Sequence, residues 1–184
     1  MYSIARLLTV FIVTLLVCFL TTFTGLAQEK LTEQSKVFIN GIGPVRVGMT
    51  ISQASKAAGT RFVRIESGGE EYGCFYFKPQ SEPREVSFMV TKGRISRVDV
   101  ESNRRIATVK GARIGDTEAR IKSLYPKRIR VTQHVYVERG HYLTFIPQDR
   151  PDRNYRLVFE TDGDRVTNFR SGQVPEVEAI EGCS

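Results

Sequence analysis

The sequence predicts an α+β fold made of two tandem repeats, each a helix packed on a small antiparallel sheet. The first observation is a repeated phrase: VRVGMTISQASKAAG at residues 45–59 returns as ARIGDTEARIKSLYP at residues 112–126. The second is a matching hairpin at the end of each half, where Phe88 corresponds to Phe159. One helix on a small sheet leaves apolar surface exposed, and two copies bury that surface against each other.

The first 27 residues have the pattern of an export signal. Arg6 gives a positive start, an apolar run extends to Leu20, and small residues lead to Ala27. These are the features of a secretory signal, so we predict a signal peptide at residues 1–27 that is removed. The alternative is an uncleaved membrane anchor, although this run is short for a full span of about 20 apolar residues.

The rest of the chain divides into a lead-in and two repeats. Residues 28–43 are predicted to be a flexible lead-in, residues 44–108 the first α+β repeat, and residues 109–184 the second repeat with a C-terminal tail. Removing the signal takes away one of the 27 Lys and Arg residues, against 20 Asp and Glu, so the remaining chain stays basic. Its length is sufficient for a buried core.

Each copy of the phrase is predicted to begin a capped helix. In the first copy, Thr50 is the N-cap and Gln53 follows three residues later, which is a capping box. In the second copy, Thr117 is the N-cap, but Arg120 takes the box position, so the reciprocal bond is absent. The two helices should therefore start in the same way but with unequal caps.

The two helices also share an apolar stripe with the spacing i, i+3, i+4, which marks one buried face. The stripe residues are Ala54, Ala57 and Ala58 in the first copy and Ile121, Leu124 and Tyr125 in the second. Gly59 is expected to end the first helix and Pro126 the second. The first helix therefore packs small side chains and the second packs bulky ones.

Strand patterns follow each helix, and tight turns TKGR and DGD separate the last two strands of each half. Arg94 and Arg165 take equivalent places in these closing hairpins. The expected strands are Gly73–Phe77, Glu85–Val90 and Ile95–Val100 in the first half, and Arg130–Val137, Tyr142–Ile146, Tyr155–Thr161 and Arg165–Arg170 in the second.

Two cysteines, Cys74 and Cys183, remain after removal of the signal. An even pair in an oxidising compartment favours a disulfide, and only one pairing is available. This bond would close a loop of about 100 residues, which is worth up to about 4.7 kcal/mol in the chain-entropy treatment. It would attach the C-terminal tail to the first half. The alternative is two free thiols.

The layout resembles the tandem-repeat β-lactamase-inhibitor-like proteins and the single-repeat SmpA/OmlA lipoproteins of the bacterial envelope. The residues that carry the resemblance are the two phrases at 45–59 and 112–126, which are similar to the strand–Gly–x–Thr–helix opening of each repeat in that group. The resemblance implies a sheet that serves as a protein-binding face, or a small envelope scaffold. The chain also looks like a group of uncharacterised secreted bacterial proteins that end in a motif such as EVEAIEGCS.

A basic segment at residues 104–130 is the first candidate binding surface. It contains nine cations and only two acids, Asp116 and Glu118. Such a surface would attract an anionic polymer, lipid headgroups or an acidic protein, whereas the alternative is an ordinary solvated face. The candidate anion-binding residues are Arg104, Arg105, Lys110, Arg113, Arg120, Lys122, Lys127, Arg128 and Arg130.

A predicted hairpin over residues 131–147 is the second candidate. With a turn at Arg139-Gly140, Glu138 pairs with His141 and both histidines lie on one face, about 13 Å apart at 3.3 Å per residue. That separation is too large for a shared metal ion. The face is either a half-buried layer under the helix or a partner-binding surface with aromatic anchors. Its residues are His134, Tyr136, His141, Leu143 and Phe145.

No motif predicts an enzyme, a metal site or a cofactor. The sequence lacks a G-x-S-x-G nucleophile motif, so a small hydrolase is only a remote alternative. Aromatic residues do not alternate with the basic segment as they do in single-strand binders, so nucleic acid is not expected. We therefore predict an exported, non-catalytic protein-binding or scaffold module of the bacterial envelope or extracellular space. The alternative is an anion-binding surface protein that docks on cell-wall polymer or acidic lipid.

Overall fold

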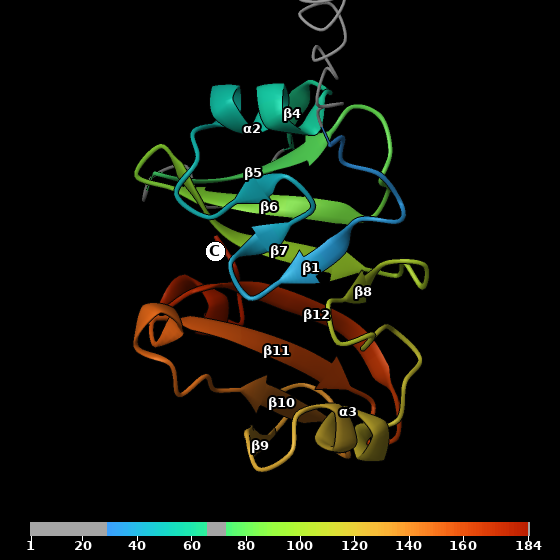
Figure 1. Cartoon of the computed structure of the whole chain (residues 1–184). Helices are drawn as coiled ribbons and strands as arrows, with labels where there is room; N and C mark the ends of the chain where they lie inside the picture. Colours follow the sequence, from blue (N-terminus) through green and yellow to red (C-terminus); the bar gives the residue numbers. More distant parts are fainter. Residues whose placement is uncertain (1–28, 66–72, 184) are drawn as a thin grey trace, which may run out of the picture.

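The computed structural model describes residues 29–65 and 73–183, so the predicted signal peptide lies outside the described residues. The fold is mostly β, with 41% of residues in strands and 14% in helices (Figure 1). Its strands form two sheets, one of eight strands and one of four. The predicted α+β class, with a helix packed on each of two small sheets, is therefore wrong. No helix among the described residues is long and apolar enough to cross a membrane.

The eight-stranded sheet is antiparallel throughout and contains strands from both halves of the chain. In spatial order its strands are β4 (Phe62–Ile65), β5 (Cys74–Pro79), β6 (Val86–Thr91), β7 (Arg94–Glu101), β12 (Val166–Gln173), β11 (Tyr155–Thr161), β10 (His141–Phe145) and β9 (Ile129–Gln133). The two four-stranded meanders meet where β7 pairs with β12, and Figure 1 shows them as the upper and lower parts of one sheet.

The pairing of β7 with β12 explains why two separate small sheets do not form. All six interior residues of β7 are buried, and β12 is buried over most of its length. An eight-residue strand with both faces buried and one edge unpaired would leave a row of backbone donors and acceptors unsatisfied. Joining the two meanders satisfies those groups and places Val100 beside Phe169.

The second sheet is small and lies over the larger one. Its strands, in spatial order, are β3 (Val45–Arg46), β2 (Gly41–Ile42), β1 (Lys36–Phe38) and β8 (Ala107–Thr108). The prediction of a flexible lead-in at residues 28–43 is therefore wrong, because this segment contains β1 and β2. It is ordered because Leu31, Val37 and Ile42 are buried in the main core.

The helices are short and contribute little of the core. Within residues 29–65 and 73–183 they are α2 (Ile51–Ala58) and α3 (Glu118–Leu124), with single 3-10 turns at η2 (Arg150–Asp152) and η3 (Glu176–Glu178). The predicted caps are confirmed: Thr50 and Gln53 form the reciprocal capping box, whereas Thr117 only accepts from the backbone of Arg120. Figure 1 shows α2 and α3 at opposite ends of the molecule.

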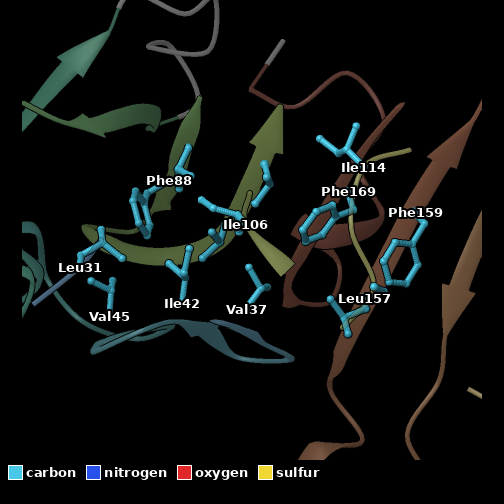
Figure 2. Close-up of a cluster of buried hydrophobic side chains, with 14 of the residues drawn as sticks. Leu31, Val37, Ile42, Val45, Phe88, Ile106, Ile114, Leu157, Phe159 and Phe169 are labelled. Carbon is cyan, nitrogen blue, oxygen red and sulfur yellow. The ribbon is translucent and has the colours of Figure 1, made fainter. Parts of the chain in front are cut away.

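The main core fills the space between one face of the large sheet, the small sheet and the two helices. Figure 2 shows Ile42 and Val45 of the small sheet beneath Phe88 and Ile106, with Val37 between this group and the second-half side chains. The second-half group includes Ile114, Leu157, Phe159 and Phe169. One continuous core therefore serves both halves.

The first copy of the repeated phrase binds the start of β7. The Gly48 N–H donates to the carbonyl of Ile95, and the Ile95 N–H donates to the carbonyl of Met49. The Arg94 guanidinium donates to the carbonyl of Gly48 at 2.8 Å. The glycine and the basic residue are therefore partners across a turn rather than parts of a ligand site.

The second copy makes the same contacts at the start of β12. The Gly115 N–H donates to the carbonyl of Val166, the Val166 N–H donates to the carbonyl of Asp116, and Arg165 donates to the carbonyl of Gly115 at 3.0 Å. These contacts account for both sequence matches at once, because each phrase is docked against the closing strand of its own half.

Both phrase glycines have a φ of 91°, a conformation that side chains rarely adopt. A Cβ at Gly48 or Gly115 would meet nothing within 4 Å, so the cost of a side chain is one of backbone conformation alone. We expect Gly48→Ala and Gly115→Ala each to lower the free energy of unfolding by about 1–2 kcal/mol, as measured by urea titration. Ser52→Ala on the exposed side of α2 is the control and should change it by less than about 0.5 kcal/mol. Equal midpoints for all three variants would contradict this account.

Candidate functional site

A disulfide and a C-terminal tail cover the face of the large sheet that lies opposite the main core. Cys74 and Cys183 are bonded, with their Cα atoms 5.4 Å apart, which confirms the predicted pairing. The tail is the segment between β12 and Cys183. It passes over the sheet, and the side chain of its own residue Val177 is buried against the sheet. The far end of the chain is thereby tied to β5, as the sequence predicted.

Two buried arginines hold the tail by its backbone. Arg97 of β7 donates to the carbonyls of Glu176 and Ala179, at 3.0 and 2.7 Å. Arg170 of β12 donates through Nε to the carbonyl of Val177 at 2.7 Å. These contacts are to backbone carbonyls, so they do not depend on the side chains of the residues that they hold.

Each of these arginines is also paired with a carboxylate beside it. Arg97 binds Asp99 at 2.9 Å, with both side chains almost fully buried. Arg170 binds Glu160, whose other oxygen accepts from Asn168 at 3.1 Å. Burial raises the pKa of Glu160, but the Arg170 guanidinium and these hydrogen bonds outweigh it, so the pKa lies below its ordinary value. The pair is therefore an ionised one.

The β9–β10 hairpin differs from the predicted one. His141 pairs with Gln133, Leu143 with Val131 and Phe145 with Ile129, so the expected turn at Arg139-Gly140 and the expected pairings are wrong. The strand predicted to reach Val137 ends at Gln133, and residues 134–140 form the connection. The register is displaced by an odd number of residues, and such a shift moves a side chain to the other face of the sheet.

That shift separates the five residues predicted to share a face. Leu143 and Phe145 pack in the main core, and Phe145 lies 4.8 Å from the ring of Tyr125. His141 lies on the same side and contacts Glu118 of α3 at 2.7 Å. His134 lies on the opposite face, and Tyr136 projects from the loop. The predicted sheet face therefore does not exist as one surface.

The loop at residues 134–140, which we call the recognition loop, is closed by its own hydrogen bonds. The His134 N–H donates to the carbonyl of Gly140, and the Gly140 N–H donates to the carbonyl of Val137. A Cβ at Gly140 would lie 2.5 Å from the carbonyl oxygen of Thr161, so glycine is required for the close approach to β11. The loop thus has a defined shape although it lies at the surface.

The His134 side chain is the internal support of the recognition loop. Its Nδ1 accepts from the backbone N–H groups of Tyr136, at 3.0 Å, and Val137, at 3.2 Å. The imidazole is stacked on Tyr142, with ring centroids 4.4 Å apart, and its Nε2 lies 3.5 Å from Glu160. Only 9% of the side chain is exposed. A nearly buried group therefore determines the shape of an exposed loop.

Exposed apolar side chains are concentrated in this same region. Among the described residues, six large hydrophobic side chains are exposed, and four of them lie within residues 131–137. The four are Val131 at 43%, Val135 at 62%, Tyr136 at 66% and Val137 at 38% exposure. They lie on β9 and the recognition loop, and β9 is the last strand of the sheet, with its outer edge unpaired among the described residues. We call β9 and the recognition loop together the β9 surface.

The basic segment is partly neutralised in the folded chain. Four of its nine cations form ion pairs with acids: Arg105 with Glu33, Arg120 with Asp116, Lys122 with Glu118 and Arg130 with Glu178. The other five form no ion pair within the described part of the chain. These five are Arg104, Lys110, Arg113, Lys127 and Arg128, and they come from three connections between elements. Lys127 and Arg128 directly precede β9.

A cleft of about 960 Å³ lies between the β5–β6 connection, β7 and the tail. Tyr76, Arg97 and Glu101 line it, together with residues of the connection. The donors of Arg97 are already used by Asp99, Tyr76 and the tail, so this cation is not available to a ligand. Over residues 29–65 and 73–183, no group of three or more acidic, His or Cys side chains could hold a metal ion.

The comparisons with known proteins give no activity. No protein-family model matches the chain, and no curated protein matches its sequence. Among solved structures, the crystal structure of the uncharacterized protein yfeY from Escherichia coli matches with a TM-score of 0.48 and 15% identity, over 78% of this chain and 99% of that one.

Sequence reasoning found Tyr136 and His134 but missed the residues that surround them. Val135, Val137, Glu160 and Arg170 were placed in strands and not among the candidate site residues. The sequence did contain one signal, the run VYV beside a polar turn. Connections between hairpin strands are usually polar, so three large apolar residues there are unusual. The network of Glu160 and Arg170 had no local signal, since its members come from different strands.

Proposed function

We propose that this protein is an exported, non-catalytic protein-binding module, and that the β9 surface is its docking site. The observation that carries the proposal is the concentration of exposed valine and tyrosine side chains on an open sheet edge. Isolated exposed hydrophobic residues are ordinary, but a concentration of them in one short segment points to an interaction site. Tyrosine is among the residues that dominate binding energy in interfaces.

The defined shape of the recognition loop supports the same function. A loop that is already ordered loses less conformational entropy when a partner binds. Here the backbone bonds of His134 and Gly140 hold Val135 and Tyr136 in exposed positions before any partner arrives. An open edge strand beside the loop offers backbone donors and acceptors to an extended segment of the partner.

The charge next to β9 indicates the chemistry of that segment. Lys127 and Arg128 precede β9 without acidic partners among the described residues, whereas the exposed valines lie toward its other end. An extended segment with acidic residues at one end and apolar residues at the other is complementary to this arrangement. Export is supported by the Cys74–Cys183 bond, because disulfides persist mainly in oxidising compartments.

Site-specific photocrosslinking tests the proposal. A photoreactive phenylalanine analogue is placed at Tyr136 and, as the matched control, at Val109, which is 55% exposed at a different place. We expect a protein adduct from the producing cells at position 136 and none at position 109. With the captured protein purified, Val135→Ser with Tyr136→Ser should weaken binding by at least about tenfold, as for hot-spot residues. Equal adducts at both positions, or no adduct at 136, would contradict the proposed site.

The anion-binding alternative is tested alongside. Binding to anionic vesicles or cell-wall polymer should weaken with added salt and disappear when Arg104, Arg105, Lys127 and Arg128 are reversed in charge. If the wild-type chain binds such a probe and the Val135→Ser, Tyr136→Ser variant binds it equally well, the basic segment is the functional surface instead of the β9 surface.

A further inference from the structure

Two backbone N–H groups of the recognition loop donate to a single nitrogen of the His134 side chain. Nδ1 of His134 accepts two backbone N–H groups, so this nitrogen carries no proton in the structure. The ring proton is then on Nε2, which faces the carboxylate of Glu160 at 3.5 Å. A second proton can only go to Nδ1, which both loop amides already contact and which also lies 3.5 Å from the hydroxyl group of Tyr142.

Protonation of Nδ1 would therefore turn the atom that accepts the two loop N–H groups into a hydrogen-bond donor. The N–H groups of Tyr136 and Val137 would then face another N–H, and each would lose its partner. Donors left without acceptors are costly unless they reach water, and these amides lie at the surface, where opening the loop exposes them. The change that follows is an opening of the loop that presents Tyr136.

The side chains around the His134 imidazole are the groups with which a protonated ring would interact. Glu160 from β11 is a carboxylate held by Arg170 from β12, and Tyr142 from β10 is stacked against the ring. Asn168 is the neutral partner of the same carboxylate. The Glu160 carboxylate therefore faces Nε2, and the hydroxyl group of Tyr142 lies 3.5 Å from Nδ1.

We propose that His134 is a proton-operated latch that presents the recognition loop when neutral and releases it when protonated. Histidine is the side chain whose charge ordinarily changes between about pH 5 and 8. The inference rests on the proposed function in one respect: the released loop would no longer offer Tyr136 and Val137 to a partner. Binding at the β9 surface would thus be favoured at neutral pH and lost at mildly acidic pH.

The latch itself is testable without a partner. The probe is the protection of the Tyr136 and Val137 amides against hydrogen exchange, measured by NMR at pH 7.5 and pH 5 and referred to the core amide of Phe159. We expect the protection of both loop amides to fall at least about tenfold at the lower pH in the wild-type chain, while Phe159 is unchanged, as for a local opening.

Two variants separate the latch from a general loss of structure. His134→Asn supplies an oxygen acceptor that does not titrate, so its loop amides should stay protected at both pH values. His134→Leu supplies no acceptor, so they should be unprotected at both. Equal protection of the wild-type loop at the two pH values, or the same fall in His134→Asn, would overturn the latch.

The crosslinking experiment at the two pH values then distinguishes the latch from the function. An adduct at position 136 that is lost at pH 5 in the wild-type chain but kept in His134→Asn supports both. Loss of protection at pH 5 with no adduct at either pH supports the latch and rejects the docking function. An adduct that survives at pH 5 although the loop amides have lost protection overturns the latch as a control of binding.

Discussion

Replacing Arg170 by methionine is expected to lower the free energy of unfolding by about 3–5 kcal/mol, because it leaves the Glu160 carboxylate buried without its cation. The same change removes the donor that holds the carbonyl of Val177. Chemical denaturation followed by circular dichroism measures the effect. The double variant Arg170→Met, Glu160→Gln should recover part of the loss, since no buried charge is then unpaired. If the double variant is less stable than Arg170→Met, charge pairing is not the cause.

The same pair predicts the direction of the pH dependence. The pKa of Glu160 is lower in the folded chain than its ordinary value of 4.5, so the folded state binds its proton less readily than the unfolded state. The stability from this group is complete above the unfolded pKa and is lost as the pH falls through the folded pKa. Between pH 6 and pH 3, wild-type stability should therefore fall more steeply than that of Glu160→Gln, and parallel profiles would contradict the assignment.

Removing the disulfide is the second large effect that we expect. Cys74→Ser with Cys183→Ser should lower the free energy of unfolding by about 2–5 kcal/mol, because the bond closes a loop with a sequence separation of 109. The Arg97 and Arg170 bonds to the tail remain, so the variant should still fold at 25 °C, with a lower denaturation midpoint. Reduction of the wild-type chain should give the same midpoint.

The double serine variant provides the control for that measurement, because adding reductant to it should change nothing. If reduction also lowers the midpoint of the double serine variant, the reductant acts elsewhere. If the wild-type midpoint does not move on reduction, the tail is held by its hydrogen bonds alone.

Local patterns allowed the helix starts and most strands to be predicted, because capping and alternation depend on residues close in sequence. Thr50, Gln53 and Thr117 act as expected, and the strand Tyr155–Thr161 was predicted to the residue. Five short strands were missed, among them β1 around Val37. Strands of two to four residues show too little alternation to be recognised, so only their partners in space define them as strands.

The fold class failed for a different reason. Each meander was predicted well enough, but whether β7 and β12 remain edges or pair with each other depends on a contact between residues far apart in the chain. The prediction of two small sheets assumed that each helix covers its own sheet. With only Ala54, Ala58 and Ile121 buried on the helices, the helices are too small to do so, and the strands take over that role.

The candidate surface was half predicted. Tyr136 and His134 were predicted as members of one hairpin face, but in the structure two backbone N–H groups of the loop donate to the His134 side chain. Such bonds compete with the strand ladder and are not visible as periodicity. The basic segment was visible as composition, whereas its ion pairs with Glu33 and Glu178 come from the two ends of the described chain.

The pairing of β7 with β12 also determines how late in synthesis the large sheet can be completed. β7 ends at Glu101, but its partner strand does not begin until Val166, and the tail that covers both follows later still. The first half of the chain therefore has an open central strand until nearly all of the second half has been synthesised. Long-range strand pairing of this kind makes folding slow and leaves an early fragment prone to association. A chain truncated before β12 would thus be an aggregation-prone fragment rather than a smaller folded protein.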